Sequence, residues 1–194
     1  SHDWPTVAHV KSARQLYWTV LHYGACGCGW LGQHAFGQSI FDVARTGNEL
    51  EMRSLLDQHP EQINQLSEQG LSPFILAAYR GNNAVAKLLI ERGADIKTCY
   101  PEGSAIYGVI YKNNIEVLDL LLKQGVSVND TCQFNQFGTP LQFAMSLKRY
   151  DIIERIMKEN PNMLLLDQHG KSIVELLAMY KDEKLNQIIQ SHEK

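Results

Sequence analysis

The stretch Gly70-Leu-Ser-Pro-Phe-Ile-Leu-Ala-Ala78 returns in altered form three more times along the chain. The later copies begin at Gly103, Gly138 and Gly170, so the glycines follow one another at intervals of 33, 35 and 32 residues. Each copy is followed by a second apolar run with helical spacing: Val85 to Ile90, Val117 to Leu122, Ile152 to Met157, and Leu185 to Ile189. A fixed period of this length indicates a repeat architecture, in which every repeat is one small structural unit.

The residues at the start of each copy predict where its first helix begins. A serine or threonine at this point can accept a hydrogen bond from an amide of the first helical turn, and a proline can follow it because that position needs no N–H group. The predicted N-caps are Ser72, Ser104, Thr139 and Ser172, and the prolines are Pro73 and Pro140. Because one helix pair cannot bury its own apolar face, the repeats are expected to stack on one another.

A period near 33 residues, with a turn, a Ser/Thr-Pro helix start and a Leu-Leu helix, resembles the ankyrin repeat. The positions that agree are Ser72-Pro73-Phe74, Ala77-Ala78, Gly81-Asn82, Leu88-Leu89 and Gly93-Ala94-Asp95. The resemblance covers about residues 39–190. It implies an all-α solenoid of about five stacked helix-turn-helix repeats with short β-hairpin turns, at approximately 39–66, 67–99, 100–131, 132–166 and 167–194.

Two parts of the chain depart from this pattern. The third repeat has Ala105 in place of the proline and Val109-Ile110 in place of the alanine pair, so we expect it to pack less regularly. Residues 1–38 lie outside the repeats, and their apolar spacing predicts an amphipathic helix over 6–23, followed by a glycine-rich loop. This segment is expected to cap the first repeat or to act as a leader.

Composition excludes some classes of function. The net charge is −3, so a nucleic acid partner is not expected. No run of eighteen apolar residues suggests a membrane-spanning helix. Four cysteines are too few for a disulfide-dense secreted scaffold, which favours a reducing compartment and a cytoplasmic location, with an exported or periplasmic location as the alternative.

We find no catalytic site in the sequence and expect no cofactor. The segment from Gly27 to Gly32 matches the dinucleotide pattern G-x-G-x-x-G, but no predicted strand precedes it. His22, Cys26, Cys28 and His34 could ligate zinc, although one residue between the cysteines is a poor spacing. A metal-dependent or enzymatic module in this leader, with the repeats as its targeting arm, is therefore the alternative hypothesis.

The resemblance implies a protein partner that is bound along the hairpin tips and the inner face of the first helices. We expect the chain to be a monomer when free and to act as an adaptor or as a stoichiometric inhibitor of the immunity-protein type. Tyr79, Arg80, Tyr111, Phe137 and Tyr180 would form a ladder across the repeats, unless each aromatic ring only covers its neighbour's helix. The predicted partner-binding residues are Glu68, Gln69, Leu71, Tyr79, Arg80, Glu102, Tyr111, Lys112, Phe137, Leu147, His169, Lys171 and Tyr180.

Overall fold

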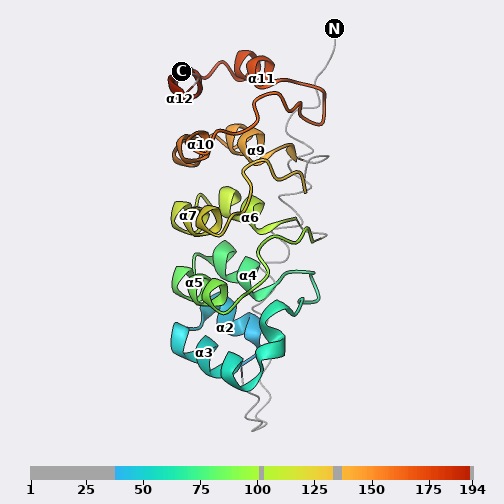
Figure 1. Cartoon of the computed structure of the whole chain (residues 1–194), viewed down its shortest axis with the longest axis vertical. Coiled ribbons are helices and arrows are strands. Elements are labelled where there is room, and N and C mark those ends of the chain that lie inside the picture. Colours follow the sequence, from blue (N-terminus) through green and yellow to red (C-terminus); the bar gives the residue numbers. More distant parts are fainter. Residues whose placement is uncertain (1–37, 101–102, 133–136, 193–194) are drawn as a thin grey trace, which may run out of the picture. The chain divides into compact units, whose positions relative to one another are not determined.

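A computed structural model describes residues 38–100, 103–132 and 137–192, which belong to one compact unit that begins at Gln38. Five helix pairs are stacked in this unit (Figure 1). In chain order the pairs are α2 (Ile40–Thr46) with α3 (Glu49–Gln58), α4 (Pro73–Arg80) with α5 (Asn83–Glu91), α6 (Ala105–Tyr111) with α7 (Ile115–Lys123), α9 (Pro140–Ser146) with α10 (Tyr150–Met157), and α11 (Ile173–Tyr180) with α12 (Glu183–His192). A short 3-10 helix, Pro60–Asn64, follows the first pair.

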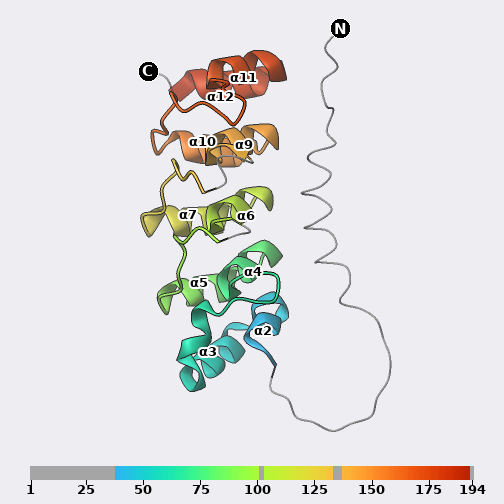
Figure 2. The same cartoon turned by 90° about the vertical axis from the view of Figure 1, so that its right-hand side faces the viewer.

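The helices form two layers. The first helices, α2, α4, α6 and α9, contact one another in succession, and so do the second helices, from α3 through α5, α7 and α10 to α12. Figure 2 shows the same two columns side by side. Within the described residues there is no strand, and the only β-bridge joins Tyr100 to Gly103. The predicted all-α solenoid is confirmed.

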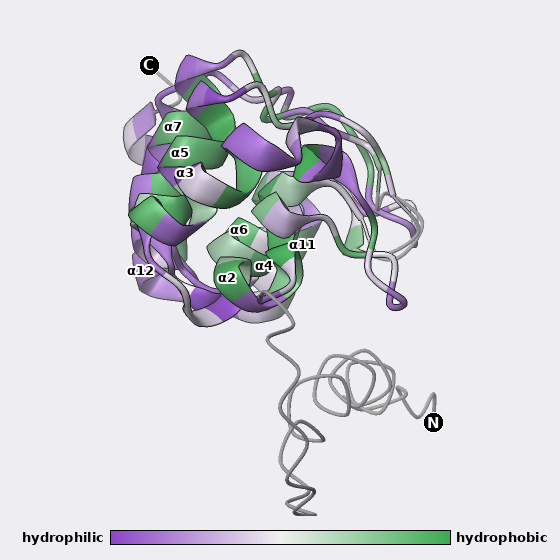
Figure 3. Ribbon diagram, turned by 90° about the horizontal axis from the view of Figure 1, so that it is seen from below, coloured by the Kyte–Doolittle hydropathy of each residue, from purple (hydrophilic) through white to green (hydrophobic). Residues whose placement is uncertain are grey.

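The core lies where the layers and the neighbouring repeats meet. Ala44, Ala77 and Leu89 are fully buried, and Figure 3 shows hydrophobic residues between the layers and hydrophilic ones around the outside. Val109 and Ile110 of the third repeat are fully buried as well. The expected loss of regular packing is therefore not seen at these two positions, because the larger side chains fill the space between the repeats.

Three of the four predicted N-caps form. The hydroxyls of Ser72, Thr139 and Ser172 each accept from the amide three residues ahead, at 3.3 Å. Ser104 occupies the same position, but the amide of Tyr107 donates at 3.2 Å to the Ser104 carbonyl oxygen, and the described residues offer its buried hydroxyl no partner. The predicted side-chain cap is therefore wrong at Ser104.

A disulfide joins Cys99 to Cys132. The two cysteines are 33 residues apart, which is one repeat length, so they occupy matching positions one repeat apart. Their Cα atoms are 5.5 Å apart, within the usual range for a disulfide. The bond therefore links the segments that lead from one repeat into the next.

Reduction of this bond is expected to destabilise the repeat array. A cross-link that closes a loop of about 33 residues removes freedom from the unfolded chain and stabilises the fold by roughly 2–4 kcal/mol. The double variant Cys99→Ser/Cys132→Ser should lose this much in urea unfolding, and reductant should destabilise the original chain but leave the variant unchanged. Equal urea midpoints for both proteins without reductant would contradict a stabilising role for the disulfide.

Candidate partner-binding surface

The turn between the two helices of a repeat has a recurring backbone conformation. The residue just before the second helix's N-cap is left-handed in four repeats: Gly81 (φ 75°), Asn113 (φ 55°), Lys148 (φ 53°) and Lys181 (φ 49°). A positive φ is easy for glycine and tolerated by asparagine, whereas it is uncommon for lysine. The repeats therefore keep one turn geometry even where the residue type disfavours it.

The next residue in each turn reaches across to the preceding repeat. The side-chain amide of Asn82 donates to the Gly47 carbonyl oxygen at 2.9 Å, and Arg149 donates from Nη2 to the Tyr111 carbonyl oxygen at 2.8 Å. Asn114 makes a longer bond to the Ala78 carbonyl oxygen, at 3.4 Å. Carbonyls at a helix end lack helical partners, so these bonds satisfy them and fix the register between repeats.

This register brings part of the predicted ladder together. The rings of Tyr79 and Tyr111 stack with centroids 5.9 Å apart and an interplanar angle of 7°, and Lys112 Nζ lies 4.4 Å from the Tyr79 ring centroid. Tyr79 is 8% exposed and Tyr111 is half-buried, while Arg80 and Lys112 are exposed. Two repeats thus present a joined aromatic and cationic surface at the ends of their first helices.

The ladder does not continue through Phe137. The Phe137 ring lies 4.6 Å from that of Phe143 and 6.4 Å from that of Tyr107, centroid to centroid, in a cluster near the hairpin side of the repeats. Tyr107 is held there by its hydroxyl, which is 2.8 Å from the Gly138 carbonyl oxygen. The prediction of one continuous ladder is therefore wrong, because Phe137 occupies a hairpin position and Tyr111 a helix-end position.

The helix-end positions of the last two repeats are only partly apolar. Ser146 stands where Tyr111 stands one repeat earlier, so no ring extends the stack. Leu147 and Tyr180, both predicted site residues, are half-buried against the core. Burial first, and then the charge of Asp167, raise the pKa of Tyr180, so its hydroxyl stays neutral at ordinary pH.

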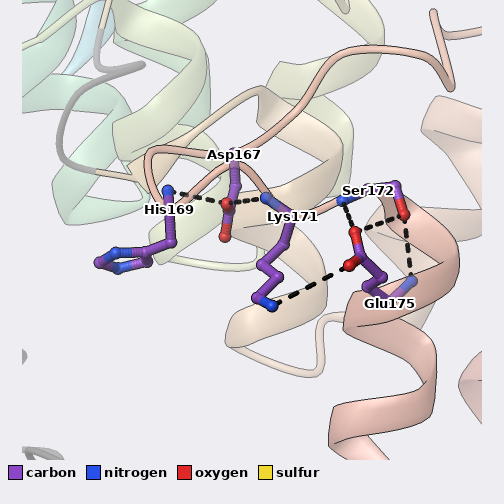
Figure 4. Close-up of polar contacts among 5 residues, drawn as sticks. All are labelled: Asp167, His169, Lys171, Ser172 and Glu175. Carbon is purple, nitrogen blue, oxygen red and sulfur yellow. Dashed lines mark hydrogen bonds and ion pairs between the residues drawn. The ribbon is translucent and has the colours of Figure 1, made fainter.

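The hairpin tips carry the remaining predicted residues. Glu68 and Gln69 are exposed and Leu71 is half-buried, in a turn closed by the Ser67 amide, which donates to the Leu71 carbonyl oxygen at 3.0 Å. In the last repeat, Asp167 Oδ1 accepts from the amides of His169 and Lys171 (Figure 4). Glu102 lies outside the described residues.

Figure 4 also shows how the last hairpin is joined to the helix that follows it. Lys171 Nζ lies 3.9 Å from Glu175 Oε1, and the amide and hydroxyl of Ser172 donate to Glu175 Oε2. These donors lower the pKa of Glu175, which keeps it charged. His169 projects from the turn, so this tip offers an exposed imidazole and a lysine already near a carboxylate.

Four basic residues at the first-helix ends or in the turns were not among the predicted site residues: Arg45, Lys148, Arg149 and Lys181. Lys148 Nζ lies 3.2 Å from Asp182 Oδ2, which also accepts from the Tyr150 hydroxyl at 2.8 Å. Their periodic spacing could have identified them, since every repeat has at least one lysine or arginine in the last residues of its first helix or in the turn.

Across the described ranges, no three His, Cys, Asp or Glu side chains gather as a metal site would require. His22, Cys26, Cys28 and His34, the ligands of the alternative hypothesis, lie outside those ranges, as does the helix predicted over 6–23. No described helix combines the length and the apolar character that crossing a membrane demands.

Comparison with known proteins identifies the repeat. The ankyrin repeat family model matches residues 69–99, which is the second predicted repeat. The chain is 32% identical over 91 residues, 46% of its length, to the rat (Rattus norvegicus) ankyrin repeat and SAM domain-containing protein 6, and that match spans 10% of the rat protein.

Two further relatives are similar over about half of the chain. Palmitoyltransferase akr1 of Aspergillus oryzae is 29% identical over 47% of the chain and 12% of the enzyme. The target of rapamycin complex 2 subunit AVO2 of Saccharomyces cerevisiae is 27% identical over 58% of the chain and 27% of that subunit. The chain thus covers only a small part of the length of these curated relatives.

The stacked helix pairs and their periodic turn surface define a repeat solenoid of the protein-binding class. The chain is an ankyrin-repeat protein. The ankyrin repeat is in general a non-enzymatic fold for protein–protein interaction, although some proteins that contain it are enzymes.

Asp182 should make the last repeat sensitive to acid. The Tyr150 hydroxyl, and then the Leu185 amide, lower the pKa of Asp182 from 3.8 to about 2. Because the folded-state pKa lies below the unfolded one, the stabilisation is complete above pH 3.8 and is lost as the pH falls toward about 2.

The substitution Asp182→Asn should therefore flatten the dependence of the melting temperature on pH in this window. Asparagine occupies the matching position as Asn82 and Asn114, so the variant is expected to fold. Thermal melts at a series of acidic pH values make the comparison. An unchanged acid slope would show that Asp182 is not the group that titrates.

Proposed function

We propose that this chain is a non-enzymatic binding module that holds a partner protein along its hairpin tips and the ends of its first helices. The observation that carries the proposal is the Tyr79–Tyr111 stack with Lys112 over it, flanked by the exposed Arg80. Tyrosine and arginine dominate binding energy when an interface buries them, because they contribute large contact areas and directed polar groups.

The stack is already organised before any partner arrives. Asn114 and Arg149 bond the backbone carbonyls of Ala78 and Tyr111, which fixes the backbone beside the two rings. The rings themselves are stacked on each other and partly or largely buried, so little side-chain freedom remains to be lost on binding. A rigid aromatic surface with charged edges suits stoichiometric capture of another protein, as an adaptor or as an inhibitor that covers its target. A relative that is by name a subunit of a complex supports this kind of role.

The enzymatic alternative places a metal-dependent module in residues 1–38 and leaves the repeats as a targeting arm. It is motivated by Cys26 and Cys28 between two histidines, and by the palmitoyltransferase among the relatives. It requires bound zinc that is lost on Cys26→Ser. The binding-module proposal requires no metal, so metal analysis of the purified chain separates the two.

The cytoplasmic location expected from the sequence stays a prediction, and the Cys99–Cys132 disulfide favours the exported or periplasmic alternative. Disulfides persist in oxidising compartments and are rare where thiols are kept reduced. We propose an oxidising location for this reason. Alkylation of protein taken directly from its source should leave Cys99 and Cys132 unlabelled, whereas labelling of both thiols would contradict this location.

The substitution Tyr111→Ser tests the binding surface. Serine occupies the matching position in the fourth repeat as Ser146, so the backbone accommodates it. The substitution removes the Tyr79–Tyr111 ring stack. The partner is first captured from an extract of the source organism on the immobilised original chain and identified by mass spectrometry. It should bind the variant at least about tenfold more weakly, as for the loss of an interface hot spot.

The matched control is Tyr150→Ser, which removes a half-buried tyrosine from the second-helix layer instead. Capture should survive this change. Thermal melts of both variants separate a loss of contact from a loss of stability. Retention of the partner by Tyr111→Ser, or equal loss in both variants, would contradict the proposed surface.

A further inference from the structure

The turns carry a column of positive charge. Every repeat places at least one lysine or arginine within the last residues of its first helix or in the turn that follows, and one from each repeat belongs to the column: Arg45, Arg80, Lys112, Lys148 and Lys181. All but Arg45 are exposed, and Arg45 is half-buried. Figure 2 shows the helix pairs stacked in chain order. Because the cations occupy the helix ends and turns of successive repeats, they follow one another along the stack.

Most of this charge is not neutralised inside the described structure. Arg45 pairs with Asp42 at 3.4 Å, and Lys148 pairs with Asp182 at 3.2 Å. For the other three, Arg80, Lys112 and Lys181, no carboxylate of the described residues forms an ion pair. The middle of the column is therefore available to an anion from outside.

The two helix layers differ in the sign of their charge. The first helices, each with the residue that follows it in the turn, carry four basic and two acidic residues. Both acidic residues lie in the first helical turn, where they bond Ser39 and Ser172. The second helices carry nine acidic and five basic residues. An approaching anion is thus attracted to the turn side and repelled from the second-helix side.

From this arrangement we propose that the surface binds an acidic polypeptide segment in extended conformation, which runs along the stack. The proposal rests on the proposed function and names the chemistry of its partner. Packed helices are about 8–10 Å apart, and an extended chain advances about 3.3 Å per residue. An aspartate or glutamate at every third position would therefore meet one cation per repeat.

The side chains that lie beside the cations are largely apolar, and they suit apolar residues placed between the acidic positions of the bound segment. Tyr79 and Tyr111 line the middle repeats, and Leu147 and Tyr180 the last two, all partly or largely buried. Apolar side chains of the segment would lie against this strip while its carboxylates reach the cations. A nucleic acid is disfavoured because the chain as a whole has a charge of −3.

The test uses a labelled peptide that repeats Glu-Leu-Ser and is long enough to span the array, with fluorescence anisotropy on the full chain. Binding should weaken as salt is added, because the attraction is between exposed charges. The variant Arg80→Glu/Lys112→Glu should bind at least about tenfold more weakly, since rim charges of an interface are reversed. A peptide that repeats Gln-Leu-Ser should not bind measurably.

The matched control reverses two exposed lysines of the second helices, Lys87→Glu/Lys123→Glu, with the same change in net charge. This variant should retain the affinity of the original chain within about twofold, since long-range charge effects are screened in salt. Equal loss in both double variants would show a net-charge effect only and would overturn the proposed site. Tighter binding of single-stranded oligothymidylate to the same face would overturn the polypeptide in favour of a nucleic acid.

Failure of the acidic-peptide proposal can be distinguished from failure of the proposed binding function. If the Glu-Leu-Ser peptide does not bind while Tyr111→Ser still loses its captured partner, the binding module stands and the acidic chemistry of the partner is wrong. If the peptide does not bind and Tyr111→Ser retains the partner, both proposals fail.

Discussion

The structure depends on one constraint, which is that a single pair of short helices cannot bury its own apolar face. Each repeat therefore needs a neighbour at close range, and alanine at Ala44 and Ala77 permits that approach while Leu89 fills the space behind it. Where the third repeat has Val109 and Ile110 instead, the same space is filled by larger side chains. Stability is thus spread along the stack as a series of nearest-neighbour contacts.

The turn surface follows from that stacking. Carbonyl groups at the end of one first helix are satisfied by Asn82 or Arg149 from the next repeat, so the turns are held in register and not left to water. The donor group differs from repeat to repeat: it is the side-chain amide of Asn82 in the second repeat and the guanidinium of Arg149 in the fourth. Asp182 cannot donate, and it accepts from Tyr150 and Lys148 instead. The geometry of the turn is conserved within the molecule while the side chains on it vary.

The constant turn geometry, with side chains that vary from repeat to repeat, has two consequences for binding. Tyr79 and Tyr111 stack because the register places equivalent positions of adjacent repeats in contact, and that leaves Lys112 over a ring and Arg80 in solvent. The cations of successive turns then lie on one side, while the acidic residues gather on the second helices. The two helix layers of the stack therefore differ in the sign of their charge.

The sequence by itself determined the repeat, its period, and three of the four helix caps, because these depend on local signals such as Ser72-Pro73 and on apolar spacing that recurs. Tertiary structure alone decided that Cys99 pairs with Cys132, since four cysteines allow several pairings and only the stack brings these two within 5.5 Å at their Cα atoms. It also decided that Phe137 joins the Tyr107 cluster while Tyr111 stacks on Tyr79. Ring contacts between repeats depend on where the backbone of each repeat rests on the next, and no local pattern records that distance.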